Sequence, residues 1–351
     1  MTESGTSTPA ESLQGLILRG DSNTDWEIVE AVTRAVGATG ENFSCSYVAK
    51  GPNGEGVFVK AIDIQRSLDQ SAGDPVSRTA ALLTGYERER DLLHACLRMS
   101  RVVSLRDSGL HRFPQHAIPV PFLVFEQARG DVRTTMSFPR SDYAMTLTVL
   151  HQVAVGLGQL HNARIVHQDL KPSNVLAFEE GEHKPTDLGR ASQQGFAAWW
   201  DDLPIPGQFS YAPPELRYGY ISSEWLERRM LSDFYQLGSL MAFFLTAATM
   251  PALLEAKLQP HHRVGTWGGT YEEILPVLSD AFAEVIEELA AVVPEALGEV
   301  VDIIQSLCEP DVSRRGRRGF AKLSVRSLDR YVSRLDYLAK TADMRAIGTR
   351  E

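Results

Sequence analysis

The feature that most constrains the fold is a change in the spacing of apolar residues near residue 130. Before this point, short segments such as residues 57–64 alternate apolar and polar side chains, as half-buried strands do. After it, apolar residues recur at spacings of three and four, which predicts an amphipathic helix; they are Leu147, Leu150, Val153 and Leu157. Further helices are expected near residues 232–248, 271–293, 295–308 and 320–341. The pattern predicts an α+β fold with a β-rich first part and a larger α-rich second part.

Within the first part, residues 43–49 and 57–64 are expected to form an antiparallel hairpin. The Gly- and Pro-containing segment 51–56 provides the turn between them. Residues 65–77 hold Ser, Gly, Asp and Pro and are interpreted as a loop, and residues 78–97 as the helix that follows. Three more strands are expected at residues 26–29, 102–109 and 121–128.

Length and charge narrow the class of protein. At about 150 residues per domain, 351 residues correspond to two units or one two-lobed domain. The chain has 35 Lys and Arg against 45 Asp and Glu, a net charge of −10, which argues against a protein that coats nucleic acid. Its three cysteines, at positions 45, 96 and 308, form no close pair. This excludes a disulfide scaffold and a Cys-rich metal site and fits a reducing compartment.

Two segments bear on localisation. Residues 1–12 are rich in Ser and Thr and lack the basic start and apolar run of a secretory signal, so we interpret them as part of a disordered tail. Residues 237–254 carry no charge, but Gly238, Ser239 and Pro251 dilute the run, and a membrane span needs about 20 mostly apolar residues. We therefore expect a buried core helix, no membrane association and a cytoplasmic location.

The strongest chemical signal is the sequence HQDLKPSNVL at residues 167–176. It places Asp169, Lys171 and Asn174 in one loop. Phosphoryl transfer needs a carboxylate to orient a hydroxyl, a cation to hold phosphate, and oxygen ligands for Mg²⁺. These three residues supply those groups, and Asp187, thirteen residues after Asn174, offers a second hard oxygen ligand. The loop therefore predicts a phosphoryl-transfer site.

With its neighbouring motifs, the chain resembles the eukaryotic-type (Hanks-type) protein kinase family. VFVKA is similar to the family's V-A-I-K strand, and this implies that Lys60 holds phosphate. YERERDLL resembles the helix that follows, which makes Glu89, rather than Glu87, the partner of that lysine. FLVFEQA resembles the hinge between the lobes, where Glu126 and Ala128 would offer backbone groups to adenine.

The same resemblance assigns roles in the second part. HQDLKPSN is similar to the catalytic loop, making Asp169 the base, Lys171 the phosphate contact and Asn174 a metal ligand. DLG is similar to D-F-G, which gives Asp187 as the other metal ligand. The implied cofactors are ATP and Mg²⁺.

Three later motifs complete the resemblance. YAPPE is similar to the A-P-E end of the activation segment and ends at Glu215. SDFYQLG resembles the start of a long buried helix whose Asp233 anchors the catalytic loop, and EPDVSRRG gives Arg315 as the partner of Glu215. The resemblance implies a bilobal kinase-like fold with a β-rich N-lobe and a helical C-lobe. The expected boundaries are a disordered tail at 1–20, the N-lobe at 21–129, the C-lobe at 130–320 and a C-terminal helix packed on the C-lobe at 321–351.

The chain departs from the family pattern at three places. The three glycine positions of the nucleotide-binding loop fall on Thr39, Glu41 and Ser44. Side chains there obstruct the approach of backbone to phosphate, although Ser44 keeps the position that would contact the nucleotide. The catalytic-loop Arg is replaced by Gln168, and Gln208 occupies the place of a Thr before the A-P-E motif.

The resemblance implies an ATP- and Mg²⁺-dependent serine/threonine kinase that acts on protein substrates and phosphorylates itself. Because an Arg normally reads a phosphate on the activation segment, Gln168 favours regulation by a partner protein or by folding of residues 188–214. Two alternatives stay open. The altered glycine loop and Gln168 motivate a pseudokinase, a nucleotide-binding scaffold. A small-molecule phosphotransferase shares the H-x-D-x-x-x-x-N loop, but YAPPE disfavours it. Trp199 and Trp200 are equally compatible with a docking element and with internal packing.

Overall fold

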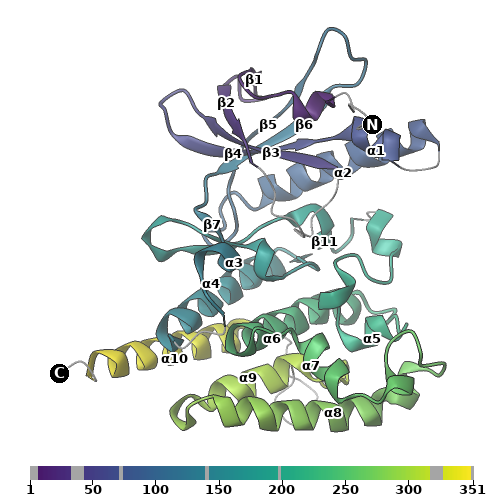
Figure 1. Ribbon diagram of the computed structural model, residues 1–351, viewed down its shortest axis with the longest axis vertical. Coiled ribbons are helices and arrows are strands. Elements are labelled where there is room, and N and C mark those ends of the chain that lie inside the picture. Colours follow the sequence, from purple (N-terminus) through teal and green to yellow (C-terminus); the bar gives the residue numbers. More distant parts are fainter. Residues whose placement is uncertain are drawn as a thin grey trace, which may run out of the picture. The chain divides into compact units, whose positions relative to one another are not determined.

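The computed structural model of the chain describes residues 7–32, 43–70, 74–138, 142–196, 199–316 and 327–348. The chain divides into two compact units (Figure 1). Unit 1 comprises Met1–Arg98 and Val103–Ala128, and unit 2 comprises Met99–Val102 and Arg129–Glu351. Strands dominate unit 1 and helices dominate unit 2, which confirms the predicted α+β class.

Unit 1 is built on a six-stranded antiparallel sheet in the order β1-β2-β3-β4-β6-β5. The strands are β1 (Ile17–Arg19), β2 (Asp25–Ala31), β3 (Ser44–Lys50), β4 (Gly56–Ile62), β5 (Leu105–His111) and β6 (Val120–Glu126). The predicted hairpin is confirmed, with Lys50 opposite Gly56 at its closed end. Alternate residues of its strands are buried, among them Tyr47, Val57 and Val59. Alternation sets which face enters the core, and so it also sets the register.

Two helices accompany the sheet, α1 (Ile64–Gln70) and α2 (Pro75–Ala95). The predicted loop at 65–77 is therefore wrong over most of its length. Two aspartates cap these helices: Asp74, interpreted as part of the loop, accepts the Ser77 amide at 2.8 Å, and Asp63, expected at the end of the preceding strand, accepts the Arg66 amide at 3.0 Å. Asp and Ser satisfy the free N–H groups of a first turn, so they mark helix starts as well as turns.

The predicted disordered tail at 1–20 is wrong for its described residues, which begin at Ser7. A 3₁₀ turn at Pro9–Glu11 and strand β1 belong to unit 1, and Ala10, Leu13 and Leu18 are buried in its core. The Tyr47 hydroxyl donates to the Ala10 carbonyl at 2.5 Å. The Ser/Thr-rich composition concealed this because the few apolar side chains lack periodicity, although Ala10, Leu13 and Leu18 are buried.

This packing predicts that Leu18→Ala destabilises the protein by about 2–5 kcal/mol, the usual cost of truncating a buried leucine. Ile17, its neighbour in β1, is 63% exposed, so Ile17→Ala serves as the matched control and should change stability by less than about 0.5 kcal/mol. Urea unfolding measures both. Equal, small effects would show that the segment is not part of the folded core.

Unit 2 is mainly helical. Its helices are α3 (Val132–Thr135), α4 (Tyr143–Asn162), α5 (Pro214–Arg217), α6 (Leu231–Thr246), α7 (Met250–Lys257), α8 (Tyr271–Val292), α9 (Glu299–Cys308) and α10 (Asp329–Gly348). Two small sheets, β10-β9-β7 and β11-β8, lie among them. Their strands are β7 (Gly130–Asp131), β8 (Ile165–Val166), β9 (Val175–Ala177), β10 (His183–Pro185) and β11 (Ser192–Gln193). Helix α10 packs along α4 and buries Tyr331, Leu335 and Leu338.

The uncharged run at 237–254 belongs to α6 and α7. Helix α6 is buried along nearly all of its length, as predicted for a core helix. Among the described residues, no single helix is long and apolar enough to span a membrane, although Leu226–Thr246 and Met250–Lys257, bent by 77°, pass that test of length and composition as a pair. Burial of α6 matters for the site, because its first turn holds the catalytic loop.

Candidate active site

The loop after β8 is fixed by the first turns of α6. Asp233 is fully buried, and its carboxylate accepts the backbone amides of His167 at 2.8 Å and Gln168 at 2.7 Å. The side chain of Gln236, one turn further along α6, accepts the Leu170 amide and donates to the Gln168 carbonyl, both at 2.9 Å. Gln168 has a positive φ of 64°, a conformation that L-residues rarely adopt. Bonds on both sides of Gln168 hold it there, and they aim the next residue, Asp169.

Asp169, Lys171 and Asn174 meet as their spacing predicted. The Lys171 Nζ lies 2.6 Å from Asp169 Oδ2, and the Asn174 Nδ2 donates to the Asp169 carbonyl at 2.9 Å and to Oδ2 at 3.3 Å. The other carboxylate oxygen, Oδ1, accepts only the Gln208 amide among the described residues, at 2.8 Å. A carboxylate oxygen has two lone pairs. Oδ1 therefore keeps the capacity to accept one more hydrogen, such as that of a hydroxyl.

Asp187 follows a residue that is bonded to the same loop. The Thr186 amide donates to the Asn174 carbonyl at 3.0 Å, and the Thr186 carbonyl lies 2.9 Å from His167 Nε2. Pairing of β9 with β10 leads both segments to this point. Asp187 itself is half-buried and has a left-handed backbone conformation, with φ at 63°. The structure thus brings Asp187 into the neighbourhood of Asn174.

Unit 1 contains the predicted lysine–glutamate pair. Lys60 on β4 lies 2.9 Å and 3.1 Å from the two carboxylate oxygens of Glu89 on α2, and the side chains are only 13% and 5% exposed. Glu87 is exposed, so the structure selects Glu89 over Glu87. A paired, nearly buried lysine is held in one orientation, as a phosphate-holding group requires.

The other predicted nucleotide contacts of unit 1 are partly described. Ser44 begins β3, two residues before Ser46, which pairs with Lys60; these three residues therefore share one face of the sheet. Glu126 ends β6, and its carboxylate accepts the Ser104 amide at 2.8 Å. The backbone amide and carbonyl of Ala128 make no hydrogen bond within the described part of the chain, which leaves both available to a ligand. The predicted positions Thr39 and Glu41 lie outside the described residues.

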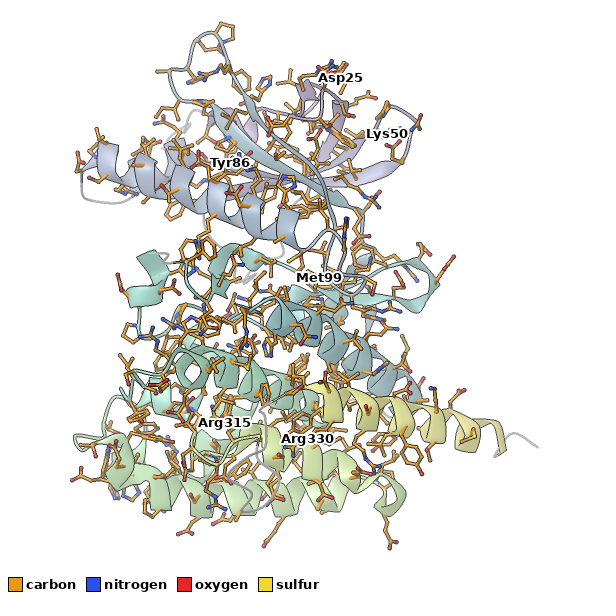
Figure 2. The ribbon with its side chains drawn as sticks, turned by 180° about the vertical axis from the view of Figure 1, so that it is seen from behind. Asp25, Lys50, Tyr86, Met99, Arg315 and Arg330 are labelled. Atoms are coloured by element: carbon orange, nitrogen blue, oxygen red, sulfur yellow. The ribbon has the colours of Figure 1, made fainter. Side chains whose placement is uncertain are left out.

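Glu215 and Arg315 form a buried ion pair, as expected. Each carboxylate oxygen accepts one guanidinium N–H at 2.7 Å, and the two side chains are 4% and 0% exposed. Arg315 also donates to the carbonyls of Glu309 and Leu231 and lies among the helices of unit 2 (Figure 2). This pair of parallel hydrogen bonds joins the end of the segment that contains Gln208 to the core of unit 2.

Within unit 2, the segment between Asp187 and Glu215 is held in place by contacts that no sequence pattern indicated. The Gln168 amide group donates to the Arg190 carbonyl at 2.9 Å, and the Trp200 indole donates to the Ala191 carbonyl at 3.1 Å. Trp200 is 2% exposed, so it packs internally and is no docking element; the side chain of Trp199 lies outside the description. Ser192 is fully buried and donates to Asp201.

Arg229 was also missed. It is 1% exposed and donates to the carbonyls of Asp201 and Leu203 in that segment. Burial, together with neighbouring Arg228, lowers the pKa of Arg229 to about 10. The sequence LERRM gives no signal of this, because a run of charged residues is usually a solvated helix face.

The sequence of the chain matches a known protein family and several known proteins. The family described as the protein kinase domain matches residues 37–317 of the sequence. The chain is 24% identical to mitogen-activated protein kinase 13 of Bos taurus over 220 residues, which are 59% of this chain and 55% of that protein. It is 26% identical to the serine/threonine-protein kinase/endoribonuclease IRE1 of Oryza sativa subsp. japonica over 239 residues, covering 66% and 22%.

A bacterial protein is similar over a shorter stretch. The chain is 31% identical to serine/threonine-protein kinase PknL of Mycobacterium tuberculosis over 132 residues, which are 37% of this chain and 31% of that protein. The chain thus spans about half or less of the length of these relatives. The domain match, in contrast, covers most of the chain and includes every residue assigned to the site above. The chain belongs to the protein kinase family.

Proposed function

We propose that this chain is an ATP- and Mg²⁺-dependent serine/threonine kinase that phosphorylates proteins, itself among them. The observation that carries the proposal is the environment of Asp169. Its Oδ2 is neutralised by Lys171, while its Oδ1 keeps a free lone pair beside the Gln208 amide. A carboxylate so placed can accept the proton of a hydroxyl as that oxygen attacks phosphorus.

The chain's own residues fit the two cofactors. Asn174 donates through Nδ2 to Asp169, so its amide oxygen is left for a cation; among the described residues, that oxygen accepts only a 3.3 Å contact from the Ser173 hydroxyl. Asp187 adds a carboxylate, and Mg²⁺ in kinases is held by such oxygens together with water and phosphate. Bound Mg²⁺ would neutralise charge on the phosphates. Lys60, oriented by Glu89, would hold the α- and β-phosphates, and Lys171 the γ-phosphate.

In the transfer step, Asp169 takes the hydroxyl proton while the hydroxyl oxygen forms its bond to the γ-phosphorus. The bond between the γ-phosphorus and the bridging oxygen breaks, and ADP leaves with that oxygen. Lys171 stabilises the negative charge that builds up. The catalytic-loop lysine supports serine and threonine as acceptors, whereas Gln208, in place of a Thr, supplies no hydroxyl at that position.

Regulation is proposed to proceed without phosphorylation of the segment between Asp187 and Glu215. Of the hydroxyl residues in this segment, Ser192 is fully buried and bonded to Asp201, so no second kinase can reach it in this conformation, whereas Ser210 is exposed. Gln168 donates to the Arg190 carbonyl and, being uncharged, cannot form with a phosphate the ion pair that an arginine would form. A partner protein or refolding of the segment would then set the activity.

Nucleotide binding gives a direct test that separates the kinase from a scaffold that binds no metal. With ATP at about ten times its Kd, linkage raises the stability of the wild type by about 1.4 kcal/mol, and we expect most of this to require Mg²⁺. Asp187→Asn should lose the Mg²⁺-dependent part, because it removes the charged ligand. Thermal unfolding with ATP alone and with ATP plus Mg²⁺ measures it.

Asp280→Asn on α8 is the matched control, since Asp280 is exposed and lies in another part of unit 2. It should respond like the wild type. Stabilisation by ATP that is the same with and without Mg²⁺ in the wild type would support the scaffold and contradict the kinase.

A further inference from the structure

A fully buried arginine contacts the segment between Asp187 and Glu215 through one nitrogen. Arg229 is 1% exposed, and its Nη2 donates to the carbonyls of Asp201 at 2.5 Å and Leu203 at 3.4 Å. Its Nε and Nη1 find no hydrogen-bond partner within the described residues. Burying a charged group whose donors are partly unpaired is costly. Arg229 therefore adds little to stability, and its main effect is to hold the segment.

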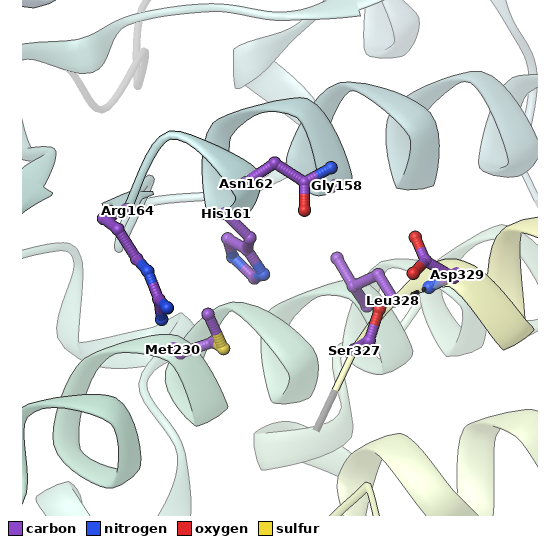
Figure 3. A pocket seen from close by; sticks show the side chains of 8 residues that line it. All are labelled: Gly158, His161, Asn162, Arg164, Met230, Ser327, Leu328 and Asp329. Carbon is purple, nitrogen blue, oxygen red and sulfur yellow. Dashed lines mark hydrogen bonds between the residues drawn. The ribbon is translucent and has the colours of Figure 1, made fainter. Parts of the chain in front are cut away.

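Arg229 lies in a π-helical turn that continues directly into α6. The turn spans Leu226–Met230, and α6 begins at the next residue. Such turns occur frequently at functional sites. Figure 3 shows the following residue, Met230, beside His161 and Leu328, where it lines a cavity of about 260 Å³. The turn thus packs toward the end of α4 through Met230 and contacts the segment through Arg229.

The start of α6 also fixes two further parts of the site. Asp233, four residues after Arg229, accepts two amides of the catalytic loop. The Leu231 carbonyl accepts Nη1 of Arg315, which pairs with Glu215 at the end of the segment. Residues 229–233 thus anchor the catalytic loop, the middle of the segment and its end.

Gln208 lies in the segment between these two anchored points. Its amide donates to Asp169 Oδ1 at 2.8 Å, the oxygen that the proposed function assigns to the substrate hydroxyl. Gly207, just before it, packs so closely that a Cβ there would lie 2.9 Å from Asp169 Oδ1 and 2.3 Å from the Gln168 carbonyl oxygen. The segment and the base are therefore in direct contact, and a shift of the segment changes the hydrogen bond on Oδ1.

We propose that Arg229 is a positioning residue for phosphoryl transfer, an inference that rests on the proposed function. By holding the carbonyls of Asp201 and Leu203, it keeps the Gln208 amide on Asp169 Oδ1. That hydrogen bond fixes the direction of the lone pair that accepts the substrate proton. Misplacing a reacting group by about 1 Å can cost about 10²-fold in rate. The contact needs no phosphate on the segment.

Amide hydrogen exchange tests this placement without any transfer step. Arg229→Met removes the donor and keeps an unbranched apolar stem. The Gln208 amide should then exchange about tenfold faster, the equivalent of one lost hydrogen bond. Global stability should change little, because the loss of the bonds from Nη2 is offset by the removal of a buried charge with unpaired donors. Exchange followed by NMR and urea unfolding measure the two quantities.

Two further variants make the test specific. Arg229→Lys places three N–H donors on one nitrogen, which suffices because only Nη2 is used. The Gln208 amide should then stay as protected as in the wild type. Arg228→Met is the matched control in the same turn, since the Arg228 side chain donates no hydrogen bond to the part of the chain that the structure describes. It should exchange like the wild type.

Activity then tests the link to the base. With dephosphorylated β-casein as the acceptor protein, Arg229→Met should lower kcat by about tenfold or more. The KM for ATP should stay unchanged, because Lys60 and Asp187 are not altered. Arg229→Lys should restore kcat, and Arg228→Met should leave it unchanged.

Three results would overturn the inference. In the first, the Gln208 amide exchanges in Arg229→Met as in the wild type, or in Arg229→Lys as fast as in Arg229→Met. In the second, kcat falls only in proportion to a loss of stability, which is the mark of a structural role alone. In the third, exchange becomes faster while kcat is unchanged. If the wild type phosphorylates neither casein nor itself, the proposed function fails, whereas exchange still decides whether Arg229 places Gln208.

Discussion

Replacing Asp169 with asparagine is expected to lower the rate of phosphoryl transfer by about 10³-fold, within the range of 10² to 10⁴ typical of a lost general base. The amide keeps the shape of the carboxylate, and it can still accept the Lys171 or Gln208 hydrogen. It cannot take the proton of the substrate hydroxyl. ATP affinity should stay close to that of the wild type, because Lys60 and Asp187 are unchanged.

The measurement is kcat with saturating ATP and Mg²⁺, together with ATP binding by the same variant. Asp280→Asn is again the control and should retain full activity. Transfer by Asp169→Asn at the rate of the wild type would refute the assignment of the base. Loss of both activity and ATP binding would point to unfolding, which far-UV circular dichroism detects.

Breaking the Glu215–Arg315 pair is expected to have the largest effect on stability. Glu215→Gln and Arg315→Met each leave one partner buried and unpaired, which costs about 3–5 kcal/mol. The double variant should lose less than the sum of the two, because it leaves no charge uncompensated. Urea unfolding of all three variants measures the coupling.

The exposed pair of Lys340 and Asp336 on α10 supplies the control. Its atoms are 2.7 Å apart, like those of the buried pair, but the side chains are 72% and 40% exposed. Asp336→Asn should therefore cost far less than Glu215→Gln, since solvent screens the exposed pair. Similar losses for both would show that burial does not govern the contribution of the Glu215 pair.

The hairpin and the core helices could be predicted because their physical cause is local. The alternation of apolar and polar residues in β3 and β4, on either side of a Gly-rich turn, indicates a hairpin. The apolar run of α6 indicates a buried helix. The packing of the N-terminal segment could not be predicted, because Leu13 and Leu18 become buried only when the sheet assembles. Helix α1 was missed because Asp63, which caps it, was assigned to the preceding strand, and the rest of this short helix lies in a stretch interpreted as a loop.

In the site, too, contacts between residues close in sequence could be predicted more directly than contacts between distant residues. Asp169, Lys171 and Asn174 share one short loop, so their spacing alone predicted that they meet. Lys60 and Glu89 are far apart in sequence, and only the motif order indicated their contact. Arg229 and the amide of Gln208 act through backbone atoms of a segment without regular structure, and no sequence pattern encodes such contacts.

The central claim is that this chain transfers phosphate to proteins although Gln168 replaces the catalytic-loop arginine. The most direct test incubates the purified, phosphatase-treated chain with γ-labelled ATP and Mg²⁺, alone, with a panel of proteins and with a panel of small alcohols. We predict label on serine or threonine of protein, including the chain itself, and none with Asp169→Asn. ATP binding without any transfer, or label on the small alcohols alone, would contradict the claim.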